Sequence, residues 1–293
     1  MNEDARVARW IRGWEKSPGI LLGPGDDCAL VAPPPRGHVA VLKTDAVHEG
    51  VHFTRRDPAR LVGRKALARA VSDFAACGAT PVACLLALGT PGTPGTDAYT
   101  DGVMQGLAAA ARAWKIGLAG GETTRTARLG LTVSLYGWVR RGSDVRRSDA
   151  SPGDSLFVTG LLGGTRRGHH LRFTPRLDEG RWLAAEGLPS AMMDLSDGLG
   201  KDLPRLARAS GVSYLIRPEC LPRRRGCTPH QAVNDGEDHE LLFTVPFKHC
   251  RLLLESWPFP TRLTWIGGIL PEKYPPMTYG LKMRGYDPFA SQP

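Results

Sequence analysis

The chain has 293 residues, of which 42% are hydrophobic and 23% are charged. These fractions exclude disordered, collagen-like and coiled-coil chains. The net charge of +9 admits a nucleic-acid binder. Apart from the run Arg223–Arg225, however, the arginines are scattered, so we expect a solvated basic surface and no nucleic-acid partner. No apolar run approaches the roughly 18–20 residues that span a bilayer, and we expect a cytoplasmic protein without membrane contact.

The first half of the chain predicts helices that alternate with strands. Apolar residues at helical spacing and helix-end signals predict helices over residues 5–16, 57–78 and about 101–115. Short apolar runs and one alternating stretch predict strands over residues 39–42, 118–119 and 131–139. The polar residues Lys43, Thr44 and Asp45 follow the strand at 39–42 directly and therefore lie at its end.

The second half repeats this organisation after a turn. Residues 151–154 have the composition of a turn near the midpoint, and they predict domains over 1–150 and 151–293. A helix is expected from Leu199 to about Ser210, and strands are expected over 156–158, 191–193, 241–245 and 263–266. Because strands alternate with helices in both halves, we assign both domains to the α/β class.

Acidic residues gather in short clusters, most of them beside glycine and at predicted strand ends or turns. The clusters contain Asp26-Asp27, Asp45, Asp73, Glu122, Asp194 to Asp197, and Glu237-Asp238. Taken singly, each has a structural explanation, such as an Asx turn or a helix cap. Carboxylates that meet at strand ends repel one another unless a cation lies among them, and oxygen ligands favour Mg²⁺. Together the clusters predict a shared metal and phosphate site.

Other common sites are excluded by spacing. No GxxxxGK[ST] loop and no GxGxxG after a first strand is present, so we expect phosphates to be held through Mg²⁺. No two cysteines have CxxC spacing, which excludes the usual zinc and thioredoxin-like arrangements.

Eight segments in family order resemble thiamine-monophosphate kinase. They are residues 23–30, 44–53, 65–79, 120–124, 147–154, 194–199, 236–241 and 285–289. They are spread over nearly the whole chain. The resemblance implies the two-domain fold of aminoimidazole ribonucleotide synthetase. In that fold the N-terminal domain binds ATP and Mg²⁺ and forms a dimer barrel with its twin, and a C-terminal α/β domain follows.

The resemblance also implies the reaction and the site. ATP and thiamine monophosphate would be the substrates, and thiamine diphosphate and ADP the products. It implies several Mg²⁺ ions, with ligands at Asp27, Thr44, Asp45, Asp73, Glu122, Asp194 and Asp197. It implies ATP contacts at Gly121, Glu122, Arg147 and Ser196, and acceptor contacts at His52, Glu237 and Tyr286. The catalytic roles fall to Asp45 and Arg147.

The chemistry agrees with these residue types. The acceptor oxygen is already ionised at pH 7, so we expect direct in-line transfer without a general base or a phospho-enzyme. Repulsion between two anions is the barrier that cations must lower. Tyr286 suits stacking on the cationic thiazolium ring or the pyrimidine.

Four positions depart from the family pattern. Glu122 replaces Asp, Asp235 replaces Gly, His239 replaces Tyr, and Lys43 replaces a small hydroxyl residue. Two roles are open for Lys43, since its charge could replace a weakly held Mg²⁺ or it could point away. Two other functions also stay open. They are a sister ATP-using enzyme of the same superfamily and a non-catalytic protein that binds thiamine phosphate or nucleotide.

Overall fold

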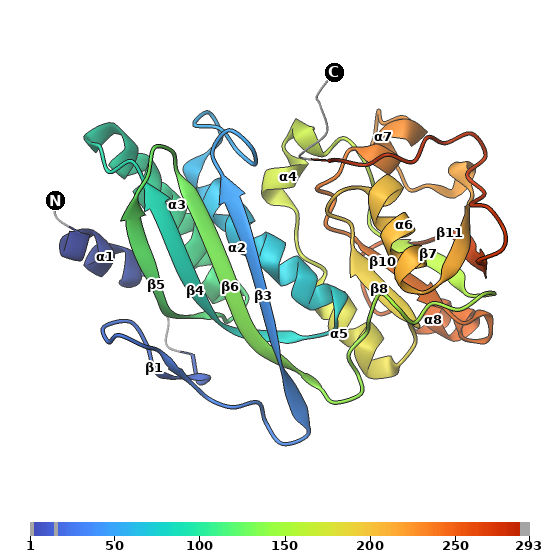
Figure 1. The fold of residues 1–293 in the computed structure, drawn as a ribbon, viewed down its shortest axis with the longest axis horizontal. Coiled ribbons are helices and arrows are strands. Elements are labelled where there is room, and N and C mark those ends of the chain that lie inside the picture. The colour runs from blue at the N-terminus through green and yellow to red at the C-terminus, as the bar shows by residue number, and fades with distance from the viewer. Residues whose placement is uncertain (1–2, 15–16, 288–293) are drawn as a thin grey trace. The chain divides into compact units, whose positions relative to one another are not determined.

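The computed structural model describes residues 3–14 and 17–287. Contacts between Cα atoms divide the chain into two compact units. Unit 1 comprises the residues up to Phe74 together with Ala79–Arg141, and unit 2 comprises Ala75–Gly78 together with the residues from Gly142 onward. In Figure 1, unit 1 carries the labels from α1 to α3, and unit 2 carries those from α4 to α8.

Unit 1 is built on a four-stranded sheet in the order β3-β6-β4-β5. Its strands are β3 (His38–His48), β4 (Thr80–Thr90), β5 (Gly117–Arg125) and β6 (Gly130–Arg140). β6 pairs antiparallel with both β3 and β4, whereas β4 and β5 run parallel. Every second residue of β6 from Leu131 to Val139 is buried, so one face of the sheet carries the core. A small hairpin of β1 (Ile20–Leu22) and β2 (Leu30–Val31) precedes this sheet.

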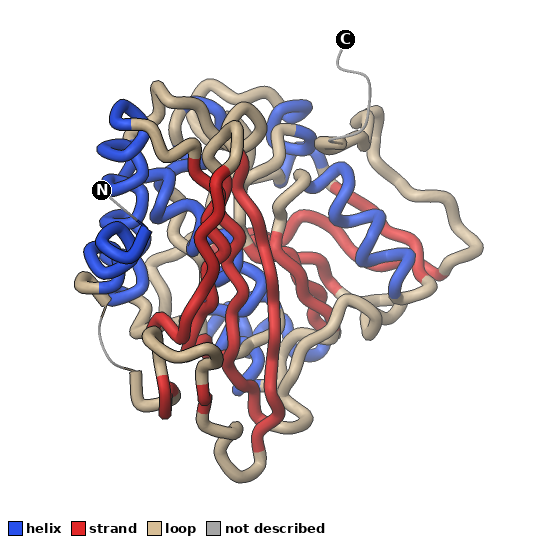
Figure 2. Tube along the Cα trace, turned by 60° about the vertical axis from the view of Figure 1, so that its left-hand side comes forward, coloured by secondary structure: helices blue, strands red, loops and turns tan. Residues whose placement is uncertain are grey.

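The helices of unit 1 are α1 (Glu3–Ile11), α2 (Ala59–Ala76) and α3 (Pro94–Ala113). Figure 2 shows helices on one side of the four-stranded sheet. Two glycines let α2 and α3 pack closely. A Cβ atom on Gly63 would lie 1.8 Å from the carbonyl oxygen of Val103, and one on Gly106 would lie 2.0 Å from that of Arg60.

Two predicted helix boundaries in unit 1 are wrong. The helix expected over 101–115 begins earlier, at Pro94, because Thr93 and Thr96 form a capping box and Pro94 takes the first helical position. The helix expected over 5–16 ends at Ile11, and its last two residues lie outside the described part of the chain. The sequence pattern also does not indicate β4, because its first half is buried on both faces and shows no alternation.

Unit 2 contains a five-stranded antiparallel sheet in the order β8-β10-β7-β11-β9. Its strands are β7 (Ser155–Thr159), β8 (Ala191–Asp194), β9 (Val212–Ile216), β10 (Leu241–Val245) and β11 (Leu263–Pro271). Its helices are α4 (His169–Arg172), α5 (Leu177–Glu186), α6 (Leu199–Ala209), α7 (Pro229–Asn234) and α8 (Cys250–Ser256).

The sheet of unit 2 is packed on both faces. Leu156 and Val158 of β7 share one buried cluster with Leu203 of α6. Phe157 points to the opposite face, where its ring stacks on that of Phe243 with 5.8 Å between centroids. Because this sheet is covered on both sides, β7 and β10 are short runs of buried, mainly apolar residues, which is the pattern the sequence predicts for them.

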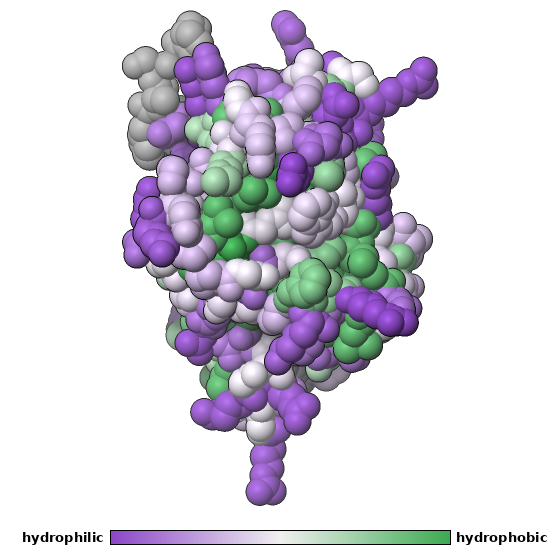
Figure 3. All heavy atoms as spheres, turned by 90° about the vertical axis from the view of Figure 1, so that its right-hand side faces the viewer, coloured by the Kyte–Doolittle hydropathy of each residue, from purple (hydrophilic) through white to green (hydrophobic). Residues whose placement is uncertain are grey.

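The surface near unit 2 mixes polar and apolar side chains. Figure 3 shows hydrophobic areas interrupted by hydrophilic side chains. Exposed large hydrophobic residues of this unit include Phe247, Leu252 and Leu254. Among the helices of the described residues, none combines the length and the apolar character that a membrane crossing requires.

Candidate active site

The ammonium group of Lys43 joins two of the predicted metal ligands in unit 1. Lys43 and Asp45 are two residues apart on β3 and therefore face the same side of the sheet, and Asp73 comes from α2. Nζ of Lys43 lies 3.0 Å from Oδ2 of Asp73 and 4.0 Å from Oδ2 of Asp45. Nη2 of Arg69 lies 3.3 Å from the other oxygen of Asp45. Asp45 and Asp73 thus meet around side-chain cations, and Lys43 does not point away from them.

Thr44 lies between these residues in sequence but faces the other side of the sheet. Its Oγ1 lies 2.9 Å from Oγ of Ser134, which is its partner in the register of β3 and β6. Leu42, on the same face, is 78% exposed. The structure therefore does not bring the hydroxyl of Thr44 to the carboxylates of Asp45 and Asp73.

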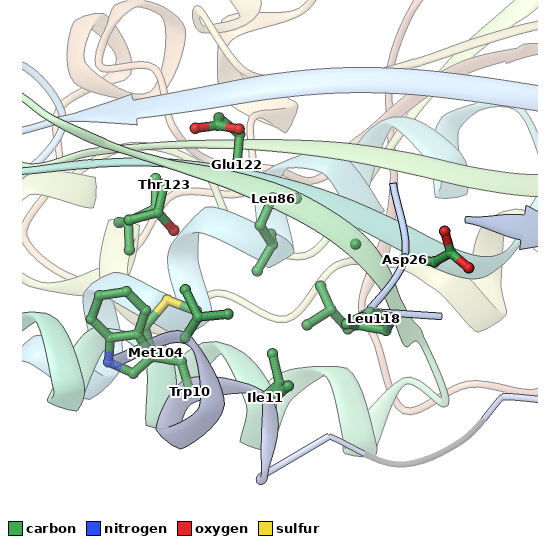
Figure 4. A pocket seen from close by; sticks show the side chains of 14 residues that line it. Trp10, Ile11, Asp26, Leu86, Met104, Leu118, Glu122 and Thr123 are labelled. Atoms are coloured by element: carbon green, nitrogen blue, oxygen red, sulfur yellow. The ribbon is translucent and has the colours of Figure 1, made fainter. Parts of the chain in front are cut away.

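A cavity of about 230 Å³ lies beside β5. Its polar lining includes Glu122 and Asp26, and its apolar lining includes Trp10 of α1, Met104 of α3 and Leu118 of β5. Figure 4 shows the apolar side chains from Trp10 and Met104 across to Leu118, with Glu122 above them and Asp26 beyond Leu118. The cavity can hold a ring with a flat apolar face and present carboxylates nearby.

Of two predicted site residues near this cavity in sequence, one lines it and the other does not. Gly121 lines it, and a Cβ atom there would lie 2.1 Å from the carbonyl oxygen of Leu86, so the pairing of β4 with β5 already requires glycine. Asp27 is exposed and does not line the cavity. Its N–H donates to Oδ1 of the preceding Asp26 at 2.8 Å, so this hydrogen bond stays within the acidic pair.

The ring of His52 has a defined hydrogen-bonding role in unit 1. The N–H of His48 donates to Nδ1 of His52 at 3.1 Å, so Nδ1 is an acceptor and the neutral ring carries its proton on Nε2. The buried ammonium of Lys65 donates to the carbonyl oxygen of His52 at 2.8 Å. This backbone anchor fixes the position of a ring whose Nε2–H is a donor.

Two loops of unit 2 that carry predicted site residues pair with each other. The N–H of Glu237 donates to the carbonyl oxygen of Ser196 at 2.7 Å, and the N–H of His239 donates to that of Leu195 at 2.8 Å. Glu237 and His239 have φ angles of +54° and +50°, in the left-handed region that non-glycine residues rarely adopt. Strain of this kind persists only where surrounding contacts enforce it, and it is frequent at functional sites.

His239 forms part of the interior beneath these loops. Its Nδ1 lies 3.3 Å from Oδ2 of Asp194, and both side chains are buried. Its ring stacks on Phe173 with 4.1 Å between centroids. The imidazole therefore packs in the interior and contacts one of the predicted metal ligands.

Asp197 lies among cations at the start of α6. Nη1 of Arg205 lies 2.7 Å from its Oδ2, and Nζ of Lys201 lies 3.7 Å from the same atom. The N–H of Asp197 donates to Oδ2 of Asp202 at 2.8 Å. Burial, reinforced by the charge of Asp194, raises the pKa of Asp202 to about 7. The loop that holds Asp197 is thus fixed by a buried carboxyl group that sequence reasoning missed.

Tyr286 and Asp197 are neighbours through the backbone. The N–H of Tyr286 donates to the carbonyl oxygen of Asp197 at 2.8 Å.

The remaining predicted residues of unit 2 are Glu237 and Arg147. Oε2 of Glu237 lies 3.5 Å from Nδ1 of His170. Arg147 is exposed, and its carbonyl oxygen accepts a hydrogen bond from Oγ of Ser210 at 2.8 Å. Within unit 2 the structure therefore brings together the predicted residues Asp194, Ser196, Asp197, Glu237 and Tyr286.

Two arginines next to these loops form ion pairs with buried acids and so do not belong to the expected solvated basic surface. Arg224, from the run Arg223–Arg225, is mostly buried and binds Asp238, which is fully buried. Burial raises the pKa of Asp238 to about 7 although Arg224 opposes this. Arg176 binds Glu240 through two hydrogen bonds of 2.6 and 2.7 Å. The Gly-Glu-Asp-His-Glu sequence signals the acidic halves of these pairs, but no spacing identifies the arginines.

The imidazole of His169 is neutral and accepts a hydrogen bond from Arg224. Its Nε2 lies 2.7 Å from Nη2 of Arg224, and because a guanidinium only donates, Nε2 of His169 must accept. Burial and the charge of Arg224 lower the pKa of His169 to about 4, which agrees with this role.

Comparison with known proteins places the chain among enzymes. The family described as AIR synthase related protein, N-terminal domain, matches residues 25–139. A thiamine-monophosphate kinase of Rhodopirellula baltica is 33% identical, with 89% of this chain and 87% of that protein covered. The crystal structure of thiamine-monophosphate kinase from Stenotrophomonas maltophilia matches with a TM-score of 0.80 at 32% identity, over 95% of this chain and 96% of that chain. A solved structure of AaThiL complexed with AMPPCP and TMP matches with a TM-score of 0.74 at 30% identity, over 90% of this chain and 89% of that chain.

Proposed function

The chain belongs to the thiamine-monophosphate kinase family, and we propose that it transfers the γ-phosphoryl group of ATP directly to thiamine monophosphate. The products are thiamine diphosphate and ADP. The observation that carries the proposal is the likeness, over nine-tenths of the chain, to a structure that holds both AMPPCP, an analogue of ATP, and TMP.

The cavity beside β5 is our proposed site for the base of ATP. Trp10 and Leu118 offer flat and apolar surface, which suits a purine ring. Gly121 and Glu122 lie on the same wall, and we keep their predicted role as ATP contacts. Arg147 and Ser196 keep the same predicted role in unit 2.

Mg²⁺ fits the donor set of unit 1. Among residues 3–14 and 17–287, no three His, Cys, Asp or Glu side chains are arranged to hold a metal ion. Mg²⁺ does not need such a cage, since it is usually held by one or two carboxylates, water and substrate phosphates. Asp45 and Asp73 supply such a pair, because both lie within 4.0 Å of one ammonium group. The other ligands proposed are Asp27, Glu122, Asp194 and Asp197. The predicted ligand Thr44 is not kept beside Asp45 and Asp73, because its hydroxyl faces the other side of the sheet and bonds Ser134.

Bound Mg²⁺ would offset the charge of the phosphates and align them for in-line displacement. The residues of the chain then bind and orient the acceptor. The Nε2–H of His52 can donate to a phosphate oxygen, Glu237 and Tyr286 contact the thiamine part, and Arg147 offsets charge on the transferred group. No side chain has to remove a proton, because the attacking phosphate oxygen is already ionised at pH 7.

We further propose that the chain forms a homodimer through the outer face of the four-stranded sheet. Leu42 of β3 is 78% exposed on this face, and Leu85 of β4 is 47% exposed. Such apolar residues on a sheet face favour burial against a second copy. In this proposal residues 1–150 serve ATP, Mg²⁺ and dimerisation, residues 151–293 form the C-terminal α/β domain, and the enzyme works in the cytoplasm.

The reaction can be tested directly. Purified protein is incubated with ATP, Mg²⁺ and thiamine monophosphate, and thiamine diphosphate is identified by mass. We expect product that disappears with EDTA and that is not formed when thiamine replaces thiamine monophosphate. Binding of both ligands without product would instead identify a binding protein, and absence of both would favour a sister enzyme.

A further inference from the structure

The segment 281–287, which carries Tyr286, contains neither helix nor strand. Its backbone polar groups must therefore find partners outside a regular hydrogen-bond ladder. Leu281 and Met283 pack against the core of unit 2, but two apolar side chains do not fix the direction in which Tyr286 points. The polar contacts of this segment decide where the tyrosine lies.

The side-chain amide of Asn234, at the end of α7, makes three of these contacts and a fourth within its own helix. Its Oδ1 accepts from the N–H of Arg284 and from the N–H of Gly285, each at 2.8 Å. Its Nδ2 donates to the carbonyl oxygens of Lys282, at 2.9 Å, and of His230, at 3.0 Å. A side-chain amide has two donor hydrogens and two acceptor lone pairs, so the full hydrogen-bonding capacity of Asn234 is used.

The segment held by Asn234 lies directly on the loop of Asp197. The N–H of Tyr286 donates to the carbonyl oxygen of Asp197 at 2.8 Å, and Nζ of Lys201 donates to that of Tyr286 at 2.7 Å. Gly285 has a φ angle of +67°, and a Cβ atom there would lie 2.4 Å from Cβ of Lys201. This close approach leaves the segment little freedom once Asn234 is bound.

The absence of a side chain at Gly200 makes room for the amide of Asn234. A Cβ atom on Gly200 of α6 would lie 2.6 Å from Oδ1 of Asn234 and 2.9 Å from the backbone nitrogen of Arg284. Asn234 is the last residue of α7, and the loop with Glu237 begins immediately after it. Asn234 therefore connects the segments that carry Asp197, Glu237 and Tyr286.

We propose that Asn234 is the positioning residue for the thiamine phosphate acceptor, acting through the segment that carries Tyr286. The proposal rests on the proposed function, because the acceptor role of Tyr286 belongs to it. Asn234 itself has no place in the chemistry. Its amide holds the tyrosine beside Asp197, and the ATP cavity of unit 1 does not depend on it.

The first test separates the two substrates. In Asn234→Ala, the lost hydrogen bonds should raise KM for thiamine monophosphate by about tenfold, whereas KM for ATP should stay within about twofold. Gln231→Ala is the matched control, because it removes the capping box at the other end of α7 and leaves the four contacts of Asn234 intact. Equal increases of both KM values in Asn234→Ala would overturn the proposal.

A double-mutant cycle tests whether Asn234 acts through Tyr286. Tyr286→Ala alone should raise KM for thiamine monophosphate more than KM for ATP. Once Tyr286 is absent, adding Asn234→Ala should change KM for thiamine monophosphate by less than about twofold. Full additivity of the two effects would contradict a role through the tyrosine.

Hydrogen exchange gives a readout that is independent of activity. Asn234→Ala should speed exchange in the peptide that contains Arg284 and Gly285 by about tenfold or more, while α6 keeps its protection. Asn234→Asp retains the two acceptor bonds and should give a smaller increase; it also serves if Asn234→Ala does not fold. Unchanged exchange in folded variants would refute the role of Asn234. Absence of product from the unaltered chain would instead refute the proposed function.

Discussion

Asp45 and Asp73 of unit 1 are neutralised in a different way from Asp238 and Glu240 of unit 2. In unit 1, the side chains of Asp45 and Asp73 are each 20% exposed and lie beside Lys43 and Arg69. In unit 2, Asp238 is fully buried and Glu240 is 3% exposed, and an arginine binds each of them. Water reaches a partly exposed pair and allows its cation to be exchanged, whereas a buried charge needs its partner to stay in place. The first group suits a site that exchanges cations, and the second suits a framework.

The largest effect expected from this contrast is a loss of turnover when an acid of unit 1 is replaced. Asp45→Asn removes a proposed metal ligand, so turnover should fall by about a thousandfold or more. The same change relieves the repulsion between Asp45 and Asp73, which does not weaken the folded state. The free energy of unfolding should change by less than about 1 kcal/mol, because the pair with Arg69 is partly exposed. Product formation and urea unfolding measure the two quantities.

Asp97→Asn is the matched control for this change. Asp97 is 24% exposed and pairs with Arg6 at 2.7 Å, in the same unit but outside the proposed metal ligands. Its turnover should be normal. A folded Asp45→Asn protein with near-normal turnover would show that Asp45 has no catalytic role.

The second effect concerns the framework of unit 2. Arg176→Met leaves the buried carboxylate of Glu240 without its cation, although Oγ1 of Thr159 still donates to it at 2.8 Å. We expect a loss of about 3–5 kcal/mol in the free energy of unfolding, measured with urea. In the double variant with Glu240→Gln, part of this loss should be recovered, because no unpaired charge stays buried.

Arg251→Met is the control for the buried pair. Arg251 and Glu255 are 2.7 Å apart, but their side chains are 86% and 61% exposed. Its free energy of unfolding should change by less than about 0.5 kcal/mol. A similar loss in both arginine variants would mean that burial does not distinguish the two kinds of pair.

The same contrast explains what the sequence could and could not predict. The alternation that buries Leu131 and Val133 is local, so it identifies β6 from sequence. The acidic clusters likewise indicate Asp45 and Asp73, which the structure does bring together. Arg176 lies 64 residues from Glu240, and no local pattern encodes a contact that depends on how the sheet of unit 2 packs. The face of Thr44 follows from strand alternation, which shows that a run of polar residues need not share one site.

The smallest effect is on the pH dependence of stability in unit 2. Burial raises the pKa of Asp238 from 3.8 to about 7. Between these values the folded state keeps a proton that the unfolded state releases. The free energy of unfolding therefore falls as pH rises through this range, by at most about 1.4 kcal/mol per pH unit from this group. Stability from the retained proton is present in acid and lost above about pH 7.

Asp238→Asn isolates this contribution because an amide does not titrate. Between pH 5 and 8, the difference in free energy of unfolding between the unaltered protein and Asp238→Asn should shift in favour of the variant as pH rises. Urea unfolding at a series of pH values measures this difference. Parallel pH profiles for the unaltered protein and Asp238→Asn would mean that Asp238 stays ionised when buried, held so by Arg224. In that case the framework acid would be neutralised by its partner alone, as the partly exposed acids of unit 1 are.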